Sequence, residues 1–128
     1  MARLVIADDS DLMRRMLRNF LYDFPRFEIV GEVRNYAEAI AAVSELKPDL
    51  LLLDIQMPGF ESRGAQAASL AAACECPIVT MSFAADAEAR VLAASTGSSF
   101  LVDKANLYHD LIPAMDAALL KRKKSRTV

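Results

Sequence analysis

Four short apolar runs in this chain each give way to polar residues. The runs are residues 4–7, 50–53, 78–81 and 100–102, and the polar residues that follow them are Asp8 and Asp9, then Asp54, Ser82 and Lys104. Uninterrupted apolar runs of this length are typical of strands buried on both faces of a parallel sheet. Because the carboxyl ends of parallel strands share one edge, where open α/β sheets bind ligands, we expect these polar side chains to meet there.

Helical patterns separate the apolar runs. Residues 11–24 place apolar side chains three and four positions apart, with Ser10 able to cap the helix and Pro25 to end it. A second helix should run from the Asn35/Glu38 capping box to Lys47 and bury Ile40, Val43 and Leu46. Residues 62–73 and 86–94 are rich in alanine, which favours two further helices. A last helix is marked by Leu107, Leu111, Met115 and Leu119. Pro113 interrupts the last pattern, which predicts a tight first turn or a kink.

The alternation of strand and helix patterns predicts the fold class. Residues 27–33 mix Glu28 and Glu32 with apolar residues, which suits an edge strand. With this run there are five strand–helix units joined by short connections. They predict an α/β fold with a doubly wound, five-stranded parallel sheet and five helices on both faces. A length of 128 residues, 54% of them apolar, is enough for one domain with its own core.

Composition argues against several classes of protein. No apolar run reaches the roughly 20 residues that a membrane helix needs, and no cationic stretch followed by a long apolar segment opens the chain. We therefore expect a cytoplasmic protein without a membrane segment. Cys74 and Cys76 are too close in sequence for an easy disulfide and lack the further ligands of a zinc site, so we interpret them as structural thiols.

Charge is distributed unevenly along the chain. The net charge is −2, and the five cations between Lys121 and Arg126 contribute +5, which leaves −7 on residues 1–120. An acidic body of this kind does not resemble a nucleic-acid-binding surface. We divide the chain into a folded domain at residues 1–121 and a basic tail, or the start of a linker, at residues 122–128. A solvated helix end is favoured there over an arm that contacts phosphate.

The carboxylates of the expected cluster have the chemistry of a magnesium site. Adjacent carboxylates at Asp8 and Asp9 repel each other unless a cation neutralises them. Mg²⁺ prefers hard oxygen ligands and keeps several waters. Asp9 and Asp54 could therefore bind it directly, and Asp8 could act through water. A loop carbonyl near Gln56 could complete the set.

The same cluster has the groups that phosphoryl transfer requires. An aspartate carboxylate can attack phosphorus and form an acyl phosphate, and Asp54 is the candidate nucleophile. In such a transfer the protein positions groups and stabilises charge on the phosphoryl oxygens. Lys104 suits that task as a point charge, and Ser82 as a short hydroxyl donor.

These residues together resemble the receiver domain of two-component response regulators. The resemblance is carried by Ala7-Asp8-Asp9-Ser10, by the segment PDLLLLDIQMPG at residues 48–59, and by Ser82 and Lys104, and it covers residues 2 to about 121. It implies a flavodoxin-like fold with strand order 2-1-3-4-5. It also implies that Asp54 is the phosphoacceptor, that Asp8 and Asp9 are the acidic pair, that Ser82 is the switch hydroxyl and that Lys104 is the phosphate partner.

The resemblance implies partners as well. The phosphoryl donor is expected to be a phosphohistidine on a sensor histidine kinase or on a phosphotransfer protein of a phosphorelay. A downstream protein or output domain is expected at the face formed by the fourth helix, fifth strand and fifth helix, and a homodimer stays open. We expect the domain to catalyse its own phosphorylation and slow dephosphorylation without multiple turnover, because Gln56 stands where phosphatases of the haloacid dehalogenase type have a second acid.

Two alternatives and several departures from the family stay open. The chain could be the N-terminal receiver of a DNA-binding transcription regulator, or a binding module that acts without phosphate. Leu101 occupies the position where the family usually has an aromatic switch residue, and Phe100 is displaced from it by one. Ala105 replaces a common proline, and Glu61 and Ser62 replace a common Asp-Gly. None of these changes removes a group that the chemistry needs, so we predict intact phosphorylation with an altered relay of the signal.

Overall fold

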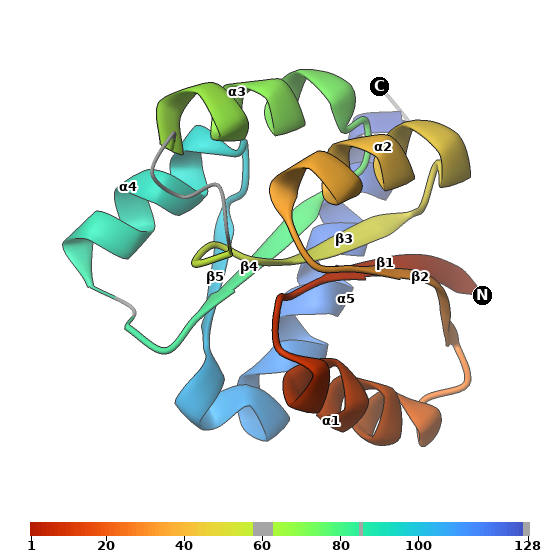
Figure 1. The fold of residues 1–128 in the computed structure, drawn as a ribbon. Coiled ribbons are helices and arrows are strands. Elements are labelled where there is room, and N and C mark those ends of the chain that lie inside the picture. The colour runs from red at the N-terminus through yellow and green to blue at the C-terminus, as the bar shows by residue number, and fades with distance from the viewer. Residues whose placement is uncertain (58–62, 85, 127–128) are drawn as a thin grey trace.

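Parallel strands form a central sheet with helices on both faces in a computed structural model of the chain (Figure 1). The structure describes residues 1–57, 63–84 and 86–126. The strands are β1 (Ala2–Ala7), β2 (Phe27–Val33), β3 (Leu50–Asp54), β4 (Ile78–Ser82) and β5 (Phe100–Asp103), and the helices are α1 (Asp11–Tyr22), α2 (Tyr36–Leu46), α3 (Arg63–Ala73), α4 (Ala87–Ser95) and α5 (Leu107–Arg126). The strand order β2-β1-β3-β4-β5 confirms the predicted doubly wound α/β fold.

Alternate residues of the central strands face two separate cores. In β1, Leu4 and Ile6 pack toward α1 and α5, whereas Val5 and Ala7 pack toward α2, α3 and α4. All four are fully buried, and the residues of β3 alternate in the same way. Burial on both faces explains why these runs contain no polar alternation. A slip of one residue in strand register would exchange the two cores.

The register of the strands aligns their carboxyl ends. Ala7 pairs with Leu53, Asp54 with Met81, and Ser82 with Asp103. The polar residues that end β1, β3, β4 and β5 therefore emerge at one edge of the sheet. Strand β2 pairs with β1 at the end of the strand order, and most of its residues are half-buried, which confirms the predicted edge strand.

The predicted helix caps are present. The Ser10 side chain accepts a hydrogen bond from the Met13 amide at 3.1 Å at the start of α1. Asn35 does the same for the Glu38 amide at 2.8 Å at the start of α2. These bonds satisfy amide donors that have no partner within the helix, so they position α1 and α2 where the chain leaves the sheet.

The buried face of α2 differs from the sequence prediction. Val43 is buried as predicted, but Ile40 and Leu46 are only half-buried at the margin of the core, and the other buried residues are Tyr36, Ala39 and Ala42. Leu46 lies over the edge strand at Gly31, where an added Cβ would be 2.9 Å from its Cδ1. The prediction was wrong for Ile40 and Leu46 because the face of α2 that carries Tyr36, Ala39 and Val43 is turned to the sheet, which leaves these two side chains at its margin.

Helix α5 accommodates its proline without a break. A 3-10 turn at Lys104–Asn106 precedes the helix, which corresponds to the tight turn that was one of the two predicted outcomes, and Pro113 lies exposed inside α5. Ala118, and not Leu119, continues the buried stripe, because a period of about 3.6 residues drifts away from a strict four-residue repeat. No helix in the described part of the chain is long and apolar enough to cross a membrane.

Replacing Asn35 by alanine should lower the free energy of unfolding by about 1 kcal/mol, because the Glu38 amide then loses its capping acceptor. Equilibrium unfolding in urea measures the change. The matched variant Asn35→Ser keeps an acceptor oxygen without adding a charge beside Glu38 and should retain most of the stability. An equal loss in both variants would show that the cap is not the source of the effect.

Candidate functional site

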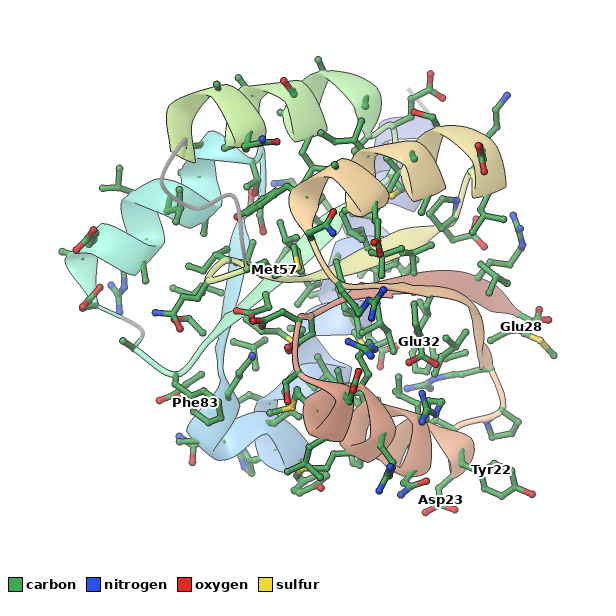
Figure 2. The ribbon with its side chains drawn as sticks, viewed as in Figure 1. Tyr22, Asp23, Glu28, Glu32, Met57 and Phe83 are labelled. Carbon is green, nitrogen blue, oxygen red and sulfur yellow. The ribbon has the colours of Figure 1, made fainter. Side chains whose placement is uncertain are left out.

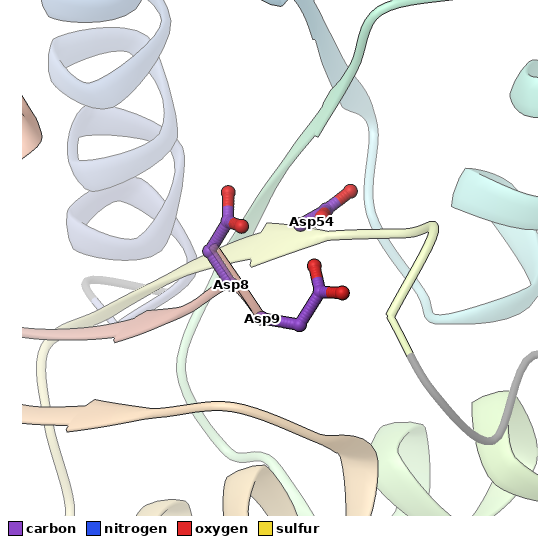
Figure 3. A group of neighbouring side chains, drawn as sticks. All are labelled: Asp8, Asp9 and Asp54. Atoms are coloured by element: carbon purple, nitrogen blue, oxygen red, sulfur yellow. The ribbon is translucent and has the colours of Figure 1, made fainter. Parts of the chain in front are cut away.

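The carboxyl edge of the sheet brings the predicted polar residues together. Asp8 and Asp9 follow β1, Asp54 ends β3, and Lys104 follows β5. One carboxylate oxygen from each of the three aspartates lies within 4.8 Å of the others (Figure 3). Asp8 and Asp54 are buried, whereas Asp9 is exposed. Three carboxylates and one ammonium leave the group with an excess of negative charge.

Lys104 joins the two buried carboxylates. Its Nζ donates a hydrogen bond to Asp8 Oδ2 at 2.8 Å and lies 3.2 Å from Asp54 Oδ2. The Lys104 side chain is 5% exposed, so solvent screens these pairs weakly. Lys104 therefore ties the ends of β1, β3 and β5 together through charge.

The charged groups around Asp54 carry more negative than positive charge. Its Oδ1 accepts a hydrogen bond from the Gln56 amide at 3.0 Å. Burial raises the pKa of the Asp54 carboxyl above its ordinary value, and the nearby Asp8 adds to the increase. The Gln56 amide and the Lys104 ammonium oppose the shift without cancelling it. The surrounding groups therefore do not fully offset the cost of the negative charge on Asp54, as is expected of a carboxylate at a cation site.

The turn between β1 and α1 fixes the position of Asp8. Its Oδ1 accepts a hydrogen bond from the Ser10 amide at 2.9 Å, and its backbone carbonyl accepts one from Arg14 Nη1 at 2.6 Å. Arg14 also pairs with Asp11, and its Nε lies 3.4 Å from Glu32 of β2 (Figure 2). Arg14 was not singled out from the sequence, where the Asp11/Arg14 spacing of one helical turn was the available signal.

Tyr36 supports the loop that follows Asp54. Its hydroxyl donates to the Ile55 carbonyl at 3.1 Å, and the side chain is 2% exposed. Burial, and secondarily the Asp54 charge, raise the pKa of Tyr36 to about 12. Tyr36 was also not singled out from the sequence. Its spacing from Ala39 and Val43, three and seven residues, places it on the buried stripe of α2 and was the available signal.

Ser82 lies at the same edge, but its hydroxyl has a local partner. The hydroxyl donates to the Ala84 carbonyl at 3.2 Å and accepts from the Ala84 amide at 3.1 Å. The neighbouring Phe83 is 62% exposed, and its ring centroid lies 5.2 Å from Lys104 Nζ (Figure 2). Leu101, the residue at the aromatic position of the family, is half-buried against the core of α2, α3 and α4.

The donors present fit a hard divalent cation. Carboxylate oxygens from Asp8, Asp9 and Asp54 converge, and the exposure of Asp9 leaves room for the waters that Mg²⁺ retains. Gln56 follows in the loop with its side chain exposed and its amide fixed on Asp54. Glu61 and Ser62, the predicted departures in this loop, lie outside the described residues.

A family model for the response regulator receiver domain matches residues 4–116. The chain belongs to this family. The acidic cluster of Asp8, Asp9 and Asp54 is the arrangement typical of a receiver metal site. Membership also implies a kinase as a partner of the receiver.

The receiver is similar to parts of larger curated proteins. It is 36% identical over 103 residues to protein-glutamate methylesterase/protein-glutamine glutaminase 5 of Myxococcus xanthus (strain DK1622), which covers 80% of this chain and 30% of that protein. It is 52% identical over 58 residues to the transcriptional regulatory protein BtsR of Escherichia coli (strain K12), which covers 45% of this chain and 24% of that protein. The chain thus spans less than a third of the length of these relatives.

Solved structures show the same fold. The signal receiver domain of a modulated diguanylate cyclase from Desulfovibrio desulfuricans G20 superimposes with a TM-score of 0.83 at 26% identity, over 98% of both chains. The response regulator domain of Thermotoga maritima CheB gives a TM-score of 0.81 at 22% identity, over 93% of this chain and 96% of that one. At these identities the likeness supports the architecture of the receiver.

Asp54→Asn should stabilise the metal-free receiver at pH 7 by about 1 kcal/mol. Because the folded-state pKa of Asp54 is raised above 3.8, its contribution to stability is complete below that pH and is lost as the pH rises through the folded value. At pH 7 the carboxylate therefore destabilises the native state, and asparagine removes that charge.

Urea unfolding of both proteins with a chelator, at pH 7 and again near about pH 4, measures the difference. The gain should shrink toward the lower pH. The exposed Glu28→Gln removes one negative charge away from the site and serves as the control, which should change the stability little. A loss of stability in Asp54→Asn at pH 7 would contradict the electrostatic description of the site.

Proposed function

We propose that this receiver accepts a phosphoryl group on Asp54 and that the modification changes the surface offered to a partner. The observation that carries the proposal is the buried Asp54 carboxylate, with Lys104 Nζ 3.2 Å from one oxygen and the Gln56 amide 3.0 Å from the other. A carboxylate held on both sides in this way is positioned to act as a nucleophile through a defined oxygen.

In the proposed reaction an Asp54 oxygen attacks the phosphorus of a phosphohistidine. A phosphorus–oxygen bond forms as the phosphorus–nitrogen bond breaks, and the imidazole of the donor leaves. The Lys104 ammonium stabilises the charge on the phosphoryl oxygens. Asp9 and Asp54, with Asp8 through water and a loop carbonyl near Gln56, would hold Mg²⁺, which would supply positive charge against the phosphoryl oxygens.

Ser82 provides a route from the phosphoryl group to the surface. Its hydroxyl now bonds to Ala84, and we propose that it turns to donate to the phosphoryl oxygen instead. The exchange frees the backbone of Ala84, so the loop that carries Phe83 can repack. Phe83 already contacts Lys104 through its ring, which gives this receiver an aromatic group beside the switch although Leu101 occupies the usual aromatic position.

The face formed by α4, β5 and α5 is the proposed surface for a downstream protein or output domain. The two helices carry the exposed apolar side chains Val91 of α4 and Leu120 of α5. The named relatives include a methylesterase/glutaminase and a transcriptional regulatory protein, so this receiver could regulate an enzyme or a DNA-binding output. The predicted division at residue 121 falls within α5, which continues to Arg126.

Incubation with Mg²⁺ and a small acyl phosphate, followed by intact-mass measurement, tests the proposed phosphorylation. The receiver should gain one phosphoryl group, and the gain should disappear in Asp54→Asn and when Mg²⁺ is omitted. The exposed Asp23→Asn should be modified like the unaltered protein. Phosphorylation of Asp54→Asn, or none of the unaltered protein beside a receiver that is modified, would overturn the proposal and favour a module that binds without phosphate.

A further inference from the structure

The two cysteines converge at the end of the sheet away from Asp54. Cys74 and Cys76 lie in the connection between α3 and β4, at the amino end of a strand whose carboxyl end is Ser82 (Figure 1). Their sulfur atoms are 3.1 Å apart, and Cys74 Sγ also lies 3.3 Å from the Cys76 carbonyl oxygen. Both side chains are half-buried, and no disulfide joins them. The phosphoryl site uses neither of them.

The backbone on either side fixes this convergence. The Cys74 amide donates to the Leu70 carbonyl at 2.9 Å, which continues the hydrogen bonding of α3. On the other side, the Pro77 carbonyl accepts from the Leu51 amide at 3.1 Å and ties the chain to β3. The proline also restricts Cys76 to extended backbone conformations. The short Cys74-Glu75-Cys76 segment is therefore anchored at both ends with its sulfurs together.

Small molecules can approach this segment from two sides. Cys76 and Glu75 line a hollow of about 240 Å³ that extends toward Lys47, and they also line a second hollow of about 250 Å³ that extends toward Lys121. The thiolate is the reactive form of cysteine. Cys76 is the thiol that lines both hollows, so it is the one placed to meet an incoming reagent.

We propose that Cys74 and Cys76 form a reversible dithiol–disulfide site that exchanges with small-molecule disulfides such as oxidised glutathione. The sulfurs need to approach by only about 1 Å to reach the bonding distance of about 2.05 Å. The short Cys-Glu-Cys spacing made a disulfide look unfavourable in the sequence, but the backbone here already brings the two sulfurs together.

The exchange proceeds in two displacements. The Cys76 thiolate attacks one sulfur of oxidised glutathione, forms a mixed disulfide and releases the first glutathione as a thiolate. The Cys74 thiolate then attacks the Cys76 sulfur, closes the intrachain disulfide and releases the second glutathione. The two protons lost by the cysteines end on the two glutathione thiols. The protein is oxidised by two electrons, and glutathione disulfide is reduced.

The test incubates the reduced protein with oxidised glutathione, blocks the remaining thiols by alkylation and measures the intact mass. The monomer should lose two hydrogens, resist alkylation and return to the dithiol with dithiothreitol. The intrachain disulfide should exceed the mixed disulfide by roughly tenfold or more, because the second thiol attacks at a high effective concentration. Cys74→Ser, the matched variant, should stop at one stable glutathione adduct on Cys76.

A structural readout accompanies the mass measurement. Closure pulls Cys74 toward Cys76, so the Cys74 amide bonded to Leu70 should exchange its hydrogen faster in the oxidised protein. The proposal would be overturned by stable glutathione adducts on the unaltered protein, by disulfide-linked dimers, or by complete alkylation of both thiols after exposure to oxidised glutathione. Stable adducts or dimers would show that the two cysteines act independently of each other, and complete alkylation would show that neither reacts with oxidised glutathione.

Discussion

The buried ammonium of Lys104 holds the carboxyl edge of the sheet together. It lies between the carboxylates of Asp8 and Asp54, which are 0% and 3% exposed and belong to segments far apart in the sequence. Removing Lys104 would leave two buried carboxylates without their cation, and a buried charge that loses its partner costs about 3 to 5 kcal/mol. One cation does not balance the two buried carboxylates and Asp9 beside them. The remaining negative charge is what a divalent cation would neutralise.

The two cores explain how the sheet holds these charges at one edge. Because β1 and β3 bury both faces, their register is fixed by large side chains such as Ile6 and Leu52 on one side and Leu53 on the other. The strand ends then meet at a fixed spacing. The turn after β1 is pinned by Ser10 and Arg14, and the loop after β3 is pinned by Tyr36. The site is thus rigid on the side that holds Asp8 and Asp54.

The fold and most of the charged cluster could be predicted from the sequence because both depend on where the apolar runs end. The sequence alone did not predict contacts between side chains that are distant along the chain. Tyr36 supports the Asp54 loop from another element, and only the packing of α2 on the sheet shows this contact. The local pairing of Ser82 with Ala84 depends on the path of a loop, which no periodicity encodes. Ile40 was misplaced because the side of α2 that carries Tyr36 and Val43 is turned to the sheet, and a ranking by hydrophobicity does not show this orientation.

We expect a divalent cation to neutralise the negative charge that remains at the carboxyl edge. The most direct measurement is the free energy of unfolding as Mg²⁺ is raised, because a ligand of the native state stabilises it by mass action. The free energy of unfolding should rise to a plateau in the unaltered receiver and should rise much less in Asp54→Asn. An unchanged stability, or an equal increase in both proteins, would show that no cation is bound through Asp54.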